Sequence, residues 1–80
     1  MKNITLDNLK PGDEAIIQDI IVNGADEADL MEMGLIQGTQ IRLVKFAPLG
    51  DPLEVCVRGY HLSLRRSDAK AIVVSRHYHG

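Results

Sequence analysis

The sequence has 80 residues and a mass of 8.8 kDa, which fits a single domain. Hydrophobic residues make up 45% of it, more than disordered chains usually contain, so we expect it to fold. So small a core leaves little room for a deep, water-excluding cleft, which argues against an elaborate enzyme. The formal net charge of −2 has the wrong sign for a dedicated binder of nucleic acids or acidic membranes.

The charge is unevenly distributed along the chain. Residues 1–38 contain two basic and eight acidic side chains, a net −6, whereas residues 39–80 contain seven basic and three acidic ones, a net +4. A dipolar chain of this kind could orient a charged partner. The simpler interpretation is that two solvated faces neutralise each other within one fold.

Cysteine content and hydropathy indicate the compartment. A single cysteine, Cys56, excludes an internal disulfide and a zinc site of paired cysteines, which fits a reducing environment. The longest apolar run covers only residues 71–74, and no charged and then apolar leader follows the first residue. We therefore expect a cytoplasmic protein with neither a transmembrane segment nor a signal peptide.

The first predicted strand covers residues 14–22. Pro11-Gly12 before it suits a type II turn, because Pro sets φ at the first central position and Gly accepts positive φ at the second. β-branched residues are frequent in this segment, but the alternation breaks at Gln18-Asp19. We expect a bend or a bulge there.

Residues 25–33 predict a short helix with acidic residues near its start, where the helix dipole favours negative charge. Gly34 is the natural stop, and Leu35 can fold back on Leu30 in a Schellman ending. Leu30 and Met33 form one apolar side of this helix, and Met31 lies on another. One side should close the end of the barrel, and the other either stays exposed for a partner or packs on the barrel as well.

The second half of the chain predicts more strands. Turn-forming residues separate them, a single helical turn is expected at 67–69, and residues 76–80 form a polar tail. Together with residues 14–22, this gives about five short strands and one short helix between the first and second of them. The predicted fold is mainly β, a small SH3-like barrel, because closure removes the edges that a flat sheet would expose. The later strands are expected at 39–46, 53–58, 61–65 and 71–75.

The sequence contains no recognised catalytic motif, and we expect no cofactor. Cys56 and His61 lie on the same face of the predicted hairpin. If Arg58 opposes His61, Cys56 is diagonal to His61, about 7–8 Å away, which is too far to share a metal. His77 and His79 in the tail could also ligate a metal, but a structural site normally requires four ligands. These four side chains are weak candidates, and we predict no metal site.

Three segments in combination are similar to the FeoA family of ferrous iron transport accessory proteins. They are residues 30–41 (LMEMGLIQGTQI), 47–55 (APLGDPLEV) and 59–65 (GYHLSLR), and the resemblance covers nearly the whole chain. The resemblance implies an SH3-like barrel with a helical insertion and no catalytic centre. It also implies that the protein acts in the cytoplasm as a partner of FeoB, the membrane ferrous-iron transporter with a GTPase domain. The characteristic positions of the family fall here at Leu30, Gly34, Leu35, Gly38, Pro48, Gly50, Asp51, Pro52, Gly59, Leu62, Leu64 and Arg65.

The chain departs from the family pattern at two places. Many members carry basic residues before the leucine of the helix, whereas Ala28-Asp29 precede Leu30 here, and Gln37 stands where proline is common. The acidic segment indicates that the partner surface of this protein has its own charge pattern.

The leading hypothesis is a monomeric, non-enzymatic interaction module that docks on the cytoplasmic part of a FeoB-type transporter. Neither nucleic-acid binding nor membrane insertion is expected. The alternative is a metal-responsive domain that resembles the SH3-like C-terminal module of iron-dependent repressors. For the leading hypothesis, the predicted contact residues come from the helix and from the proline-rich loop: Leu30, Met31, Met33, Leu35, Pro48, Leu49, Asp51 and Pro52.

Overall fold

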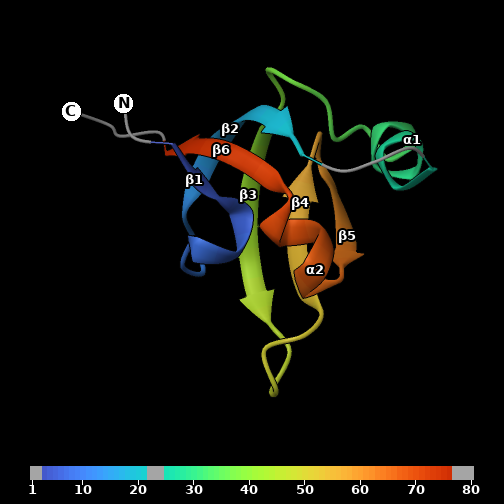
Figure 1. Cartoon of the computed structure of the whole chain (residues 1–80). Coiled ribbons are helices and arrows are strands. Elements are labelled where there is room, and N and C mark those ends of the chain that lie inside the picture. The colour runs from blue at the N-terminus through green and yellow to red at the C-terminus, as the bar shows by residue number, and fades with distance from the viewer. Residues whose placement is uncertain (1–2, 22–24, 77–80) are drawn as a thin grey trace.

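The computed structural model describes residues 3–21 and 25–76, and within them six strands form one antiparallel sheet (Figure 1). The strand order across the sheet is β1-β6-β2-β3-β4-β5. The strands are β1 (Asn3–Thr5), β2 (Glu14–Ile20), β3 (Gln40–Phe46), β4 (Leu53–Val57), β5 (Tyr60–Leu64) and β6 (Ile72–Arg76). The helices are the 3₁₀ helix η1 (Leu6–Asn8), α1 (Ala25–Glu32) and α2 (Arg66–Lys70).

The five predicted strands correspond to β2 to β6, and the predicted helix lies between the first two of them as expected. The sequence did not predict β1, which has only three residues and no apolar alternation. Among the described strands, β1 and β5 are the two edge strands and do not pair with each other, so the sheet does not close into the expected barrel. Figure 1 shows β2 and β6 running across the long direction of β3.

Two register shifts bend the sheet. One lies in β2 between Ile17 and Asp19, which confirms the predicted bend or bulge, and the other lies in β3 between Leu43 and Lys45. A bulge shifts the alternation of side chains between the two faces. Ile17 is fully buried, whereas Ile21, just after the bulged strand, is 69% exposed. The bulge in β2 therefore places an isoleucine at the surface.

The core is aliphatic and comes mainly from alternate residues of the strands. Ile41 and Leu43 of β3 and Val55 and Val57 of β4 are completely buried. The turn before β2 forms as predicted, because Gly12 has a φ of +94° and Asp13 N–H donates to Lys10 O at 2.9 Å.

Helix α1 ends in the predicted Schellman motif. Leu35 N–H donates to Leu30 O at 3.1 Å, and Gly34 N–H donates to Met31 O at 2.9 Å. Gly34 has a φ of +89°, which a residue with a side chain adopts only with strain. Leu30 is 2% exposed and Leu35 is fully buried, so the two leucines join the end of the helix to the core.

Residues 47–52 form the loop between β3 and β4, and Arg66 holds it in place. The Oδ1 atom of Asp51 accepts a hydrogen bond from Arg66 N–H at 3.0 Å, and Arg66 Nη1 donates to Gly50 O at 3.1 Å. The Arg66 guanidinium also lies 5.8 Å from the centre of the Phe46 ring. Arg65 occupies the N-cap position of α2, but its side chain accepts no hydrogen bond from the helix. Asp51 supplies an acceptor for the first turn of α2 instead.

Replacing Asp51 with alanine should lower the free energy of unfolding by about 1 kcal/mol, because a donor in the first turn of α2 loses its acceptor. Urea denaturation followed by circular dichroism measures this change. Asp51→Asn keeps an acceptor oxygen and is the matched control, with a smaller expected loss. Equal losses in the two variants would contradict this role of Asp51.

Candidate partner-binding surface

The two parts of the predicted contact surface lie at opposite ends of the molecule (Figure 1). β3 begins at Gln40, near α1, and ends at Phe46, next to the loop of residues 47–52. At about 3.3 Å per residue, a strand of this length separates the two regions by roughly 20 Å. The helix and the proline-rich loop therefore do not form one continuous surface, and contact of a single partner with both stays a prediction.

At the helix end, burial divides the four predicted contact residues. Leu30 and Leu35 are wrong as contact residues, because both belong to the hydrophobic core. Met33 is partly buried and packs against that core. Met31 is 51% exposed, so it is the predicted helix residue that offers the most side chain to a partner.

A shallow hollow of about 220 Å³ lies beside Met31. Ile20, Leu35 and Ile36 provide its other apolar side chains. We call Met31, Ile20 and Ile36 the helix-end surface. Neither isoleucine was predicted as a contact residue, because Ile20 has the sequence context of an ordinary strand residue and Ile36 that of a turn.

The β4–β5 hairpin holds the end of α1 in position. The hydroxyl of Tyr60 donates a hydrogen bond to the carbonyl oxygen of Met33. The side chain of Arg58 lies beside Gly34. A Cβ atom at that position would be 3.9 Å from Arg58 Cδ. The helix-end surface is therefore supported by the core leucines and by the tip of a hairpin.

The hairpin has a different register from the predicted one. Val57 opposes Tyr60, and the two loop residues Arg58 and Gly59 have φ values of +52° and +85°, as a type I′ turn requires. The expected pairing of Arg58 with His61 is wrong, because the positive φ values put Arg58 in the turn.

This register makes Cys56 and His61 direct cross-strand neighbours rather than diagonal ones. The Nδ1 atom of His61 lies 3.0 Å from Glu54 Oε2. Within residues 3–21 and 25–76, no group of three or more His, Cys, Asp or Glu side chains could hold a metal ion. His77 and His79, the other two weak candidates, lie outside the described residues.

At the opposite end of the sheet, Leu49 is 97% exposed, and Pro48 and Pro52 are also exposed. Asp51 is engaged with the backbone of α2, which gives it a role within the fold. In the part of the chain that the structure describes, no helix has the length and hydropathy that a membrane span requires.

Comparisons with known proteins agree with this architecture. A family model described as the FeoA domain matches residues 4–76. A curated relative from Porphyromonas gingivalis, a fusion of Fe(2+) transport protein A with the Fe(2+) transporter FeoB, is 39% identical over 69 residues. The match covers 86% of this chain but only 8% of that fusion protein.

Solved structures share both fold and sequence with this chain. The solution structure of a FeoA-like protein from Clostridium acetobutylicum is 35% identical, with a TM-score of 0.87 over 100% of this chain and 96% of that one. The crystal structure of Stenotrophomonas maltophilia FeoA with zinc is 36% identical and has a TM-score of 0.74, covering 90% of this chain and 89% of that one. That protein is described as a procaryotic SH3 domain protein, so the predicted SH3-like fold is confirmed.

The sheet also resembles part of a manganese-dependent transcriptional repressor, with a TM-score of 0.87 over 95% of this chain and 37% of the repressor. At 17% identity this likeness concerns the fold alone. The match to the FeoA family concerns the sequence as well as the fold. It spans the described residues from β1 to β6 and includes relatives of more than one-third identity. The chain belongs to the FeoA domain family, and in one curated relative such a domain is fused to a ferrous iron transporter.

Proposed function

We propose that this protein is a non-enzymatic, cytoplasmic accessory protein of ferrous iron uptake, which binds the cytoplasmic part of a FeoB-type transporter and modulates its activity. The fusion of the two modules in one chain of a relative supports this partner. A covalent link keeps two interacting modules at a high effective concentration, which is of use when their own contact is weak.

The observation that carries the proposal is the helix-end surface. Met31 is half exposed at the end of a helix that the core leucines and Tyr60 fix in place. A methionine side chain is flexible and polarizable and adapts to the shape of a partner. Ile36, 36% exposed, extends this apolar surface beyond the end of the helix.

Replacing Met31 with glutamine should weaken binding to the isolated cytoplasmic domain of the transporter about tenfold, because an exposed apolar contact is lost while the core stays intact. Isothermal titration calorimetry measures the dissociation constant, and circular dichroism verifies that the variant is folded. Leu49→Gln is the matched control, because Leu49 is even more exposed but lies at the other end of β3.

The control should bind like the wild type. If Leu49→Gln loses affinity while Met31→Gln keeps it, the partner contacts the proline-rich loop and the proposed surface is wrong.

A further inference from the structure

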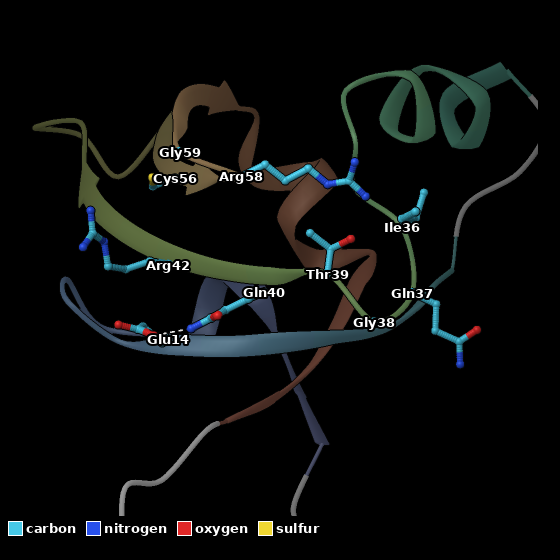
Figure 2. Close-up of a pocket in the computed structure, with 10 residues that line it drawn as sticks. All are labelled: Glu14, Ile36, Gln37, Gly38, Thr39, Gln40, Arg42, Cys56, Arg58 and Gly59. Atoms are coloured by element: carbon cyan, nitrogen blue, oxygen red, sulfur yellow. Dashed lines mark hydrogen bonds between the residues drawn. The ribbon is translucent and has the colours of Figure 1, made fainter.

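A second hollow, of about 620 Å³, lies on the outer face of the sheet next to the helix end (Figure 2). Its floor contains a row of cross-strand neighbours, in which Arg42 of β3 lies between Glu14 of β2 and Cys56 of β4. Its rim is formed by the loop of residues 36–39 and by Arg58 in the hairpin turn. We call this hollow the arginine cleft.

The arginine cleft contains more positive than negative charge. Arg42 and Arg58 both line it, and neither forms an ion pair or hydrogen bond through its guanidinium with any described residue. Glu14 opposes Arg42 in the strand register, but its carboxylate accepts a hydrogen bond from the side chain of Gln40, as Figure 2 shows. Two guanidinium groups are therefore left to interact with a ligand.

The two guanidinium groups lie toward opposite ends of the arginine cleft in Figure 2, with Thr39 near the Arg58 end. Arg58 leaves the hairpin turn and reaches toward Ile36, and its side chain rests beside Gly34. α1 has no basic residue in its own last turn, so Arg58 also places a positive charge near the negative end of that helix. The side chain of Arg58 thus lies along the end of α1.

We propose that the arginine cleft binds an acidic segment of a partner protein, with one carboxylate at Arg42 and another at Arg58. A guanidinium can form two parallel hydrogen bonds with a carboxylate, and such pairs are among the stronger contacts at interfaces. This inference deepens the proposed function and rests on it for the source of the segment, which is the cytoplasmic part of the transporter.

Two features of the surface define the ligand further. Ile36 and Gln37 line both the arginine cleft and the hollow of the helix-end surface, so one continuous segment can contact both. Such a segment would carry apolar side chains for Met31 and Ile36 and carboxylates for the arginines. The sequence contains only two Tyr, one Phe and no Trp, which disfavours a single-stranded nucleic acid, because its bases stack on aromatic side chains.

The first arm of the test uses a probe that does not depend on the transporter. ¹⁵N-labelled protein is titrated with a capped hexaglutamate peptide, and a capped hexaglutamine peptide serves as the neutral counterpart. We expect saturable chemical-shift changes at the amides of Gly38, Thr39, Arg42 and Gly59 with the glutamate peptide alone. The changes should disappear in the double variant Arg42→Gln/Arg58→Gln and persist in Lys70→Gln, an exposed cation of α2.

The second arm measures the dissociation constant for the cytoplasmic domain of the transporter. We expect the double variant to lose at least about tenfold in affinity, and Lys70→Gln to bind like the wild type. Added salt should weaken the wild-type complex more than that of the double variant, because two charge contacts are then screened.

The outcomes separate the two proposals. If the peptide binds in the arginine cleft but the transporter domain does not bind the wild type, the inference stands and the proposed function fails. If the transporter domain binds wild type and double variant equally, the inference is overturned whatever the peptide does, and the proposed function stands. The inference is also overturned if the glutamate peptide causes no chemical-shift changes in the arginine cleft, or if a single-stranded oligonucleotide binds there more tightly than the peptide.

Discussion

Replacing Leu30 with glutamine is expected to unfold the domain rather than to remove a partner contact. Leu30 is 2% exposed, and its carbonyl oxygen accepts the hydrogen bond that closes the Schellman motif of α1. Losing a buried leucine costs about 2–5 kcal/mol, and an unpaired buried amide adds to that cost. Since small domains are only marginally stable, most of the protein should be unfolded at 25 °C.

Circular dichroism during urea denaturation measures this effect, and Met31→Gln is the matched control. The same change one residue along the helix affects a side chain that is 51% exposed, so it should alter the free energy of unfolding by less than about 0.5 kcal/mol. A Leu30→Gln variant as stable as Met31→Gln would show that Leu30 does not belong to the core.

Replacing Gly34 with alanine should be the most damaging of the glycine substitutions. Gly34 has a φ of +89°, and a Cβ atom there would lie 3.1 Å from the hydroxyl oxygen of Tyr60. That hydroxyl donates to Met33 O, so the added methyl group disturbs the hydrogen bond that joins the hairpin to α1. We expect a loss of about 2–3 kcal/mol, of which backbone strain accounts for about 1 kcal/mol.

Gly12→Ala separates the two causes. Gly12 has a similar φ of +94°, but no other group lies within 4 Å of the position of its Cβ atom. Thermal unfolding of both variants and of Tyr60→Phe measures each contribution. Gly34→Ala should be less stable than Gly12→Ala by about 1 kcal/mol or more. Equal losses would mean that the contact with Tyr60 adds nothing.

The sequence could predict the features that depend on local chemistry. A glycine after a short helix, followed by a leucine, indicated the Schellman motif at Gly34, and the loss of alternation at Gln18-Asp19 indicated the bulge in β2. The segments of the family resemblance also led to the correct fold. In each case the signal lies within a few residues of the structure that it specifies.

The sequence could not predict features that depend on how residues far apart in the chain are arranged in space. Helical periodicity put Leu30 and Met31 on two apolar sides, but which side faces the core depends on how the core and the β4–β5 hairpin hold the end of the helix. The separation of α1 from the proline-rich loop depends on the length and direction of β3. The arginine cleft joins Arg42 to Arg58 only through a hairpin register that requires positive φ at an arginine.

Cross-saturation NMR of the ¹⁵N-labelled wild-type protein would map the surface that contacts the cytoplasmic domain of the transporter. We expect signal loss at residues 31–38 and at Arg42, Arg58 and Gly59, with residues 47–52 unaffected. Signal loss confined to residues 47–52 would contradict this expectation and would place the partner at the proline-rich loop.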